Sequence, residues 1–198
     1  MKHFLLYALC LLLLSLHAKA AVVYSGLQDI AIPTDFNGIF IDIDNGAASG
    51  VDFVGADINP FFGGSGFINN AAFQPARTSS VMDSAIIQLP AGAIISSSLN
   101  YATGSNESGF LNSHMGAGVS QFTPDVEAFI GFMFTKNDFS GPFFGWMRVV
   151  FTNATPGGQI RDWAYDDTGA SIAAGAPEPA RVLFFLIGLV SIGLRRRR

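Results

Sequence analysis

Short runs of β-branched and aromatic residues, broken every several positions by Gly, Ser, Asn, Pro or Asp, fill the chain between residues 21 and 167. This pattern predicts many short strands joined by turns. The clearest alternation runs from Val126 to Thr135, where Ala128, Ile130, Phe132 and Phe134 share one face. Further strands are expected at 36–44, 51–58 with a bulge at Gly55, 85–89, 144–152 and 159–165.

The predicted fold is all-β, an antiparallel β-sandwich or jelly-roll-like ectodomain over residues 21–167. Sixteen phenylalanines lie in this region, and each aromatic ring can bury roughly 150–250 Å². Two facing sheets offer enough interior for them. Residues 96–118 predict either a long loop or a pair of edge strands, and 82–87 at most one helical turn. Residues 168–176 are small and polar enough to form a linker.

The beginning of the chain resembles a secretory signal peptide. A basic Met1–His3 precedes an apolar run from Phe4 to Leu16, and Ala18 and Ala20 form a small-residue cleavage site. We expect a signal helix at 1–20 and cleavage after Ala20; an uncleaved membrane anchor is the alternative. The single cysteine, Cys10, lies inside this segment, so the mature chain would contain neither a disulfide nor a thiolate metal site.

Residues 177–198 have three parts. Pro177, Glu178 and Pro179 are followed by an apolar stretch, expected as a transmembrane helix at 180–194, and then by Arg195, Arg196, Arg197 and Arg198. The thirteen residues Val182 to Leu194 would span about 20 Å as a helix, so Ala180 and a snorkelling Arg181 must extend the usable length. Four arginines favour the cytoplasmic side of a membrane. The rest of the chain would then lie outside the inner membrane.

These residues resemble a PEP-CTERM sorting signal: a Pro-Glu-Pro box, a short apolar helix with Gly188 and Gly193, and an Arg cluster. The resemblance implies processing by an exosortase of a Gram-negative bacterium, in a setting of exopolysaccharide or biofilm. Arg181, directly after the box, departs mildly from the pattern. A plain membrane anchor behind a rigid Pro-rich stalk is the alternative. The segments Phe144–Val149, Asp162–Tyr165 and Ile172–Gly175 also resemble the closing part of β-rich PEP-CTERM ectodomains.

The charge distribution restricts the partners. Between residues 21 and 176 there are four basic and fourteen acidic residues, a formal charge of −10, although the whole chain carries −4. Such a surface repels phosphate backbones, so nucleic acid is not expected as a partner. Divalent cations and neutral molecules remain compatible with it.

No catalytic constellation is evident, so we expect a protein that is not an enzyme. His114 is the one imidazole of the mature chain, and no nucleophile motif accompanies it. One histidine without cysteine also excludes an ordinary zinc site. Glu107 and Glu127 are the glutamates before the sorting box, but no motif pairs carboxylates as a glycosidase requires.

The segment Asp42-Ile43-Asp44-Asn45-Gly46 supplies alternating oxygen ligands and a turn-forming glycine. Calcium accepts such ligands, so Asp42, Asp44 and Asp52 are the candidate calcium ligands. The pattern departs from an EF-hand, because the twelfth position is Phe53. Alternating aspartates on the wet face of a strand explain it equally well.

Trp146 and Trp163 are interpreted first as core or inter-sheet residues. A platform that stacks on sugars is the alternative. The resemblance of the chain's ends implies an exported, exosortase-sorted surface or matrix protein, and the lack of a catalytic constellation leads us to expect no enzymatic activity. Signal peptidase, exosortase, the inner membrane and extracellular polysaccharide are its expected partners. The alternatives are a carbohydrate-binding module that uses exposed aromatics and, more weakly, a polysaccharide-active enzyme.

Overall fold

The computed structural model describes residues 22–176 except 82–83, 102–110, 113–120 and 153–156. The expected signal helix and the sorting segment at 177–198 lie outside the described residues. Within them the protein is all-β, with antiparallel sheets and a single 3₁₀ turn, η2 (Phe62–Gly64). The strands are β1 (Val22–Tyr24), β2 (Ile30–Ile32), β3 (Phe40–Ile41), β4 (Ala48–Ser49), β5 (Ile58–Phe61), β6 (Gly66–Asn69), β7 (Phe73–Arg77), β8 (Ile94–Ile95), β9 (Asn100–Tyr101), β10 (Leu111–Asn112), β11 (Glu127–Phe134), β12 (Phe143–Val150), β13 (Gly158–Asp166) and β14 (Ile172–Ala173).

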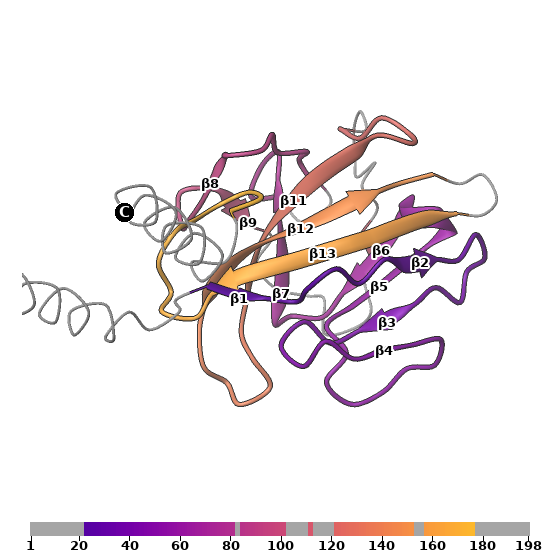
Figure 1. Cartoon of the computed structure of the whole chain (residues 1–198), viewed down its shortest axis with the longest axis horizontal. Helices are drawn as coiled ribbons and strands as arrows, with labels where there is room; N and C mark the ends of the chain where they lie inside the picture. The colour runs from indigo at the N-terminus through magenta and orange to yellow at the C-terminus, as the bar shows by residue number, and fades with distance from the viewer. Residues whose placement is uncertain (1–21, 82–83, 102–110, 113–120, 153–156, 177–198) are drawn as a thin grey trace, which may run out of the picture.

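Two large sheets and one small one make up the fold (Figure 1). The seven-stranded sheet has the order β1-β13-β12-β11-β7-β9, and β2 also pairs with β13. The five-stranded sheet has the order β10-β6-β5-β3-β4, and β14 pairs with β8. This arrangement is consistent with the predicted β-sandwich.

The three long strands form the centre of the seven-stranded sheet. β11 pairs with β12 without interruption from Phe134↔Phe143 to Glu127↔Val150. β12 pairs with β13 with a register shift at Arg148 and Val149, as expected of a β-bulge. These strands confirm the predictions for 126–135, 144–152 and 159–165 to within two residues.

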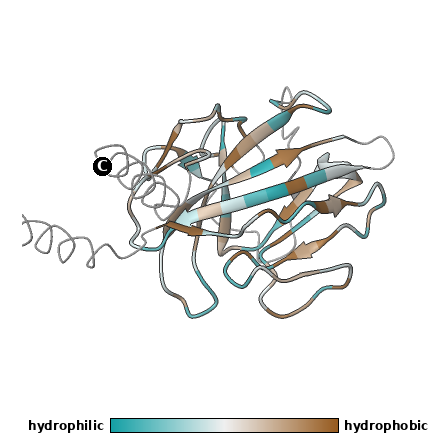
Figure 2. Cartoon of the chain, in the orientation of Figure 1, coloured by the Kyte–Doolittle hydropathy of each residue, from teal (hydrophilic) through white to brown (hydrophobic). Residues whose placement is uncertain are grey.

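Two hydrophobic clusters lie on opposite faces of this sheet. The larger one joins both large sheets and includes Ile58 and Phe67 from one and Phe132 from the other. The second covers the outer face with residues such as Ile95 and Ile172 from the small sheet. The strands are mostly hydrophobic, with a hydrophilic stretch within β13, as Figure 2 shows. Burial of both faces explains why the polar alternation of β11 is weak.

Several predicted elements differ in the structure. The strand expected at 36–44 is reduced to Phe40–Ile41, and Phe36, at the start of the expected range, is 64% exposed. The strand expected at 51–58 is a loop that turns at Gly55, whose φ is +99°, and the strand starts only at Ile58. Glycine adopts this positive φ at little cost.

Three further expectations can be compared with the described residues. Residues 84–87 contain no helical turn, because Ile86 forms a bridge with Arg77. The described parts of 96–118 contain β9 and β10, each at the edge of a large sheet, which favours the pair of edge strands. The expected linker at 168–176 is wrong, because β14 pairs with β8 and both Ile172 and Ala174 are buried. Small residues there allow close packing on the outer face.

Candidate functional site

Three aspartates, named here the acidic cluster, converge beside the start of the β3–β4 connection. Asp42, Asp44 and Asp57 each offer a carboxylate oxygen, and these oxygens lie within 4.8 Å of one another. Asp42 and Asp57 are buried, and Asp44 is half-buried. Asp42 and Asp44, two of the three candidate calcium ligands, lie together as expected. The third candidate, Asp52, is exposed and lies outside the cluster, where Asp57 takes its place.

A tight turn holds Asp42 in position. Its Oδ1 accepts the backbone N–H of Asn45 at 3.0 Å, and its Oδ2 accepts the side-chain amide of Asn45 at 2.9 Å. The backbone N–H of Gly46, with φ +69°, donates to the Asp42 carbonyl oxygen at 2.9 Å. The side-chain bond reaches three residues along the chain, one more than in an Asx turn, and like that turn it uses a short carboxylate in place of a backbone acceptor. The turn motif seen in the sequence therefore orients the first carboxylate.

Asp57 reaches the cluster from the loop before β5. Its backbone N–H donates to the Ile41 carbonyl oxygen at 2.8 Å, and its Oδ2 accepts the Ile43 N–H at 2.8 Å. Asn70 donates to its Oδ1 at 3.4 Å. Buried carboxylates need such donors, because an unsatisfied buried acceptor is costly.

Asn137, in the connection between β11 and β12, joins the cluster to the other sheet. Its side-chain amide donates to Asp42 Oδ2 and to Asp44 Oδ1, each at 3.0 Å. Its backbone N–H also donates to Asp44 Oδ2 at 3.2 Å. A Cβ on Gly55 would lie 3.0 Å from both the Asn137 amide nitrogen and Asp42 Oδ2, so the site needs glycine there. No local sequence pattern connects Asn137 to these aspartates.

The three carboxylates have unequal proton affinities. Burial raises the pKa of Asp57 to about 6, against the opposing hydrogen bonds from Ile43 and Asn70. Burial and the adjacent Asp42 raise the pKa of Asp44. Burial alone would raise the pKa of Asp42, but hydrogen bonds with Asp44, Asn45 and Asn137 hold it below its ordinary value.

None of the ion pairs found among the described residues includes a member of the acidic cluster. Carboxylate oxygens grouped this closely repel one another unless a proton or a cation lies among them. Chemically, they form a set of hard oxygen donors of the type that calcium accepts.

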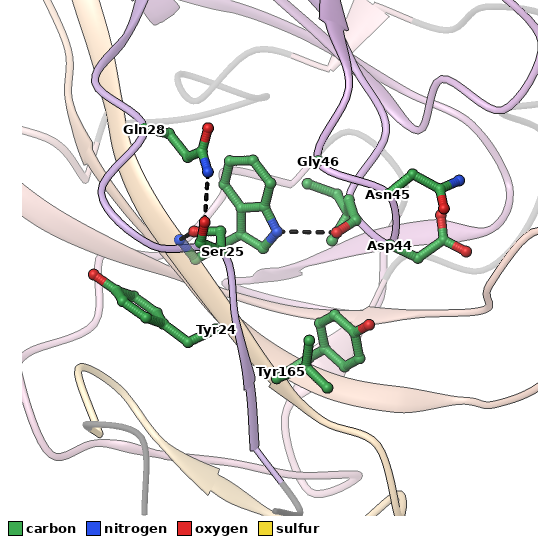
Figure 3. Close-up of a pocket in the computed structure, with 10 residues that line it drawn as sticks. Tyr24, Ser25, Gln28, Asp44, Asn45, Gly46 and Tyr165 are labelled. Carbon is green, nitrogen blue, oxygen red and sulfur yellow. Dashed lines mark hydrogen bonds between the residues drawn. The ribbon is translucent and has the colours of Figure 1, made fainter. Parts of the chain in front are cut away.

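A polar hollow of about 270 Å³ adjoins the acidic cluster through Asp44 (Figure 3). Gln28 and Ser25 lie on one side of it, and Asn45 and Gly46 on the other. Val23, Tyr24, Ile43, Trp163 and Tyr165 complete the lining. The hollow lies where β1 and β13 meet the β3–β4 connection, and nothing local in the sequence predicts this meeting.

The two tryptophans occupy opposite faces of the seven-stranded sheet. Trp163 belongs to the larger hydrophobic cluster, which joins the two large sheets (the inner cluster). Trp146 belongs to the second cluster, on the outer face. They are 2% and 3% exposed, in agreement with the interpretation as core residues. Neither ring presents a broad face to solvent, so an exposed stacking platform does not form at either position. Trp163 reaches the hollow only as part of its lining.

The other sequence candidates are separated from this site. Glu127 pairs with Arg148 at 3.6 Å, and Arg148 also pairs with Asp162 on β13. His114, Glu107, the cleavage residues Ala18 and Ala20, and the sorting residues Pro177 to Arg198 lie outside the described part of the chain. No helix in the described ranges is long and apolar enough to span a membrane.

Comparison with known proteins gave no match to a family model, to a curated protein or to a solved structure.

Proposed function

We propose that this chain is an exported surface or matrix protein of a Gram-negative bacterium whose C-terminal segment is a sorting signal read by an exosortase. One observation carries the proposal: the ordered series of the Pro177–Pro179 box, an apolar stretch and Arg195–Arg198. The apolar stretch would hold the chain in the inner membrane, with the arginines on the cytoplasmic side. Signal peptidase and exosortase are the processing partners.

The first and last described residues are compatible with this assignment. β1 starts at Val22, two residues after the expected cleavage site, and Ala176, the residue before the Pro-Glu-Pro box, donates its N–H to Ala173. Val22 and Ala176 both pack against the outer hydrophobic cluster. Removal of 1–20 and processing near Pro177 would therefore leave every described strand intact.

The proposed role is adhesive or structural rather than catalytic. The mature chain has no cysteine and a single histidine, and its formal charge is strongly negative. A jelly-roll-like sandwich, the finer form of the fold prediction, is part of the proposal. Its support is the inner cluster shared by both large sheets. Such a domain presents loops and strand edges to extracellular polysaccharide, the expected environment.

The test is the intact mass of the protein recovered from its native host. Loss of residues 1–20 together with the segment beyond the Pro-Glu-Pro box is the expected result, and any additional mass identifies the attached group. A deletion of the exosortase gene is the matched control, in which the full C-terminal segment should remain. A chain that ends at Arg198 in cells with an active exosortase would contradict the sorting proposal.

A further inference from the structure

The hollow carries unused hydrogen-bonding capacity. Gln28 donates its amide to the Ser25 carbonyl oxygen at 2.5 Å, and its Oε1 has no partner among the described residues. Asn45 likewise donates to Asp42 Oδ2, and its Oδ1 has no partner in the same set. Each amide also keeps a second N–H. Two side chains that can both donate and accept therefore line the hollow from opposite sides, with the Gln28 amide turned toward Ser25 and the Asn45 amide directed away from Gln28 (Figure 3).

The lining is held in place before any ligand arrives. The indole N–H of Trp163 donates to the Ile43 carbonyl oxygen at 3.0 Å, and its backbone N–H donates to Ser25 Oγ at 2.9 Å. The Ser25 N–H returns a hydrogen bond to the Trp163 carbonyl oxygen at 2.9 Å. These bonds connect β13, the segment after β1 and the β3–β4 connection. A site fixed in this way loses little conformational entropy when it binds.

The chemistry of the lining excludes several ligand classes. No lysine or arginine is among the lining residues, so phosphate, sulfate and acidic sugars find no counter-charge in the lining itself, although Lys136 Nζ lies 5.0 Å from the ring centroid of the lining residue Tyr165. The one carboxylate, Asp44, is already bonded twice by Asn137. The aromatic residues of the hollow supply apolar contacts, and the amides match hydroxyl groups. A few placed polar groups above an apolar floor are typical of small-molecule sites.

The volume also limits the ligand. About 270 Å³ corresponds to roughly nine water molecules at ~30 Å³ each, which admits one six-membered sugar ring. From this arrangement we propose that the hollow binds a single neutral sugar residue, such as a hexose or N-acetylhexosamine unit of a polysaccharide. The inference goes beyond sorting and holds whichever way the chain is processed.

The test is saturation-transfer difference NMR on the purified full chain with glucose, galactose, mannose and N-acetylglucosamine. Two charged analogues are included. Glucuronate tests for attraction to Lys136, whose Nζ lies 5.0 Å from the ring centroid of Tyr165, and glucosamine tests for attraction to Asp44 in the lining. The double variant Gln28→Ala/Asn45→Ala removes the two unused acceptors. The matched control is Gln88→Ala/Asn100→Ala, two exposed amides that do not line the hollow.

We expect millimolar binding of at least one neutral sugar, weakened roughly tenfold or more in the Gln28/Asn45 variant and unchanged in the control. Binding by none of the neutral sugars overturns the inference. So does equal binding in the two double variants, or preference for a charged analogue. Circular dichroism checks that each variant is folded.

A second measurement leaves the hollow intact. In a Trp146→Phe variant, Trp163 is the only tryptophan, since the chain has two. The neutral sugar that binds by NMR should change the Trp163 fluorescence along the same titration curve. Binding without any change of this signal places the sugar elsewhere and also overturns the inference.

Discussion

The indole N–H of Trp163 donates to the carbonyl oxygen of Ile43 at 3.0 Å, inside the protein and between residues 120 positions apart in the chain. This bond links the central β13 strand to the connection that carries the acidic cluster. The indole N–H of Trp146, equally buried on the opposite face, has no hydrogen-bond partner in the described part of the chain. Comparing the same substitution at the two tryptophans therefore measures how much the bond to Ile43 contributes to the free energy of unfolding.

Trp163→Phe should destabilise the protein more than Trp146→Phe. Both substitutions remove the same ring from a buried position, but only the first leaves the Ile43 carbonyl oxygen without its donor. A difference of about 1–2 kcal/mol in the free energy of unfolding is expected. Urea denaturation monitored by circular dichroism measures it. Equal losses in the two variants would show that the bond to Ile43 contributes no net stability.

Asp57→Asn should stabilise the protein at pH 8 and have little effect at pH 4. Burial raises the pKa of Asp57 from 3.8 to about 6, so the folded state favours the neutral carboxyl. The stability that the folded state gains from the neutral Asp57 carboxyl, relative to the ionised one, is fully present below pH 3.8. It is lost as the pH rises through 6. Since one pKa unit corresponds to 1.36 kcal/mol, the ionised group costs about 3 kcal/mol above that range.

Urea denaturation at the two pH values tests this expectation. Asp52→Asn is the matched control, because it removes an exposed carboxylate outside the cluster. A stabilisation by Asp57→Asn that is the same at both pH values would contradict the assigned protonation.

Calcium binding remains a prediction for the acidic cluster, and the ligand set can be distinguished by mutation. Equilibrium dialysis should show uptake at millimolar calcium that Asp44→Asn and Asp57→Asn each abolish. Asp52→Asn should retain it, because Asp52 lies outside the cluster. Calcium at a hundred times its Kd would also stabilise the fold by about 2.7 kcal/mol. Absence of uptake would end the calcium hypothesis.

Gly145→Ala should destabilise the seven-stranded sheet. A Cβ on Gly145 would lie 2.3 Å from the Phe132 ring and 2.6 Å from the Ala164 carbonyl oxygen. Overpacking of this kind costs about 1–3 kcal/mol. Gly50→Ala, where nothing lies within 4 Å of the added Cβ, is the control for thermal unfolding. Equal melting temperatures for the two variants would show that β12 relaxes without cost.

The long strands could be predicted from the sequence because each contains apolar and aromatic residues spread over eight or nine positions without a proline. The loop before β5 could not, since Gly55 has a positive φ there and the chain places Asp57, not Asp52, beside Asp42. Apolar residues such as Val51 and Val54 resemble strand positions but are exposed. The local pattern therefore does not distinguish these exposed loop residues from buried strand residues.

In the candidate site too, the local features could be predicted from the sequence and the contacts between distant segments could not. The Asp42–Gly46 turn is local and was recognised from its residue types. Asn137 and Gln28 enter only through contacts between distant segments, such as the pairing of β1 with β13. A signal for them was present in their amide side chains, but amides are common on loops. Only the pairing of the strands in the sheets shows that Asn137 and Gln28, and not other amide side chains, lie at the site.

The pairing of β13 with both β1 and β2 has a consequence for the order in which the chain folds. β13 pairs with Val22–Tyr24 and Ile30–Ile32, the first described strands. The first strands and the last long strand of the chain therefore lie side by side at one edge of the sheet. Contacts at such sequence separation form slowly and late. Until β13 is available, the first strands lack their partner. A chain that crosses a membrane from its N-terminus would thus stay unfolded and threadable during transit, and its sheet would close only afterwards.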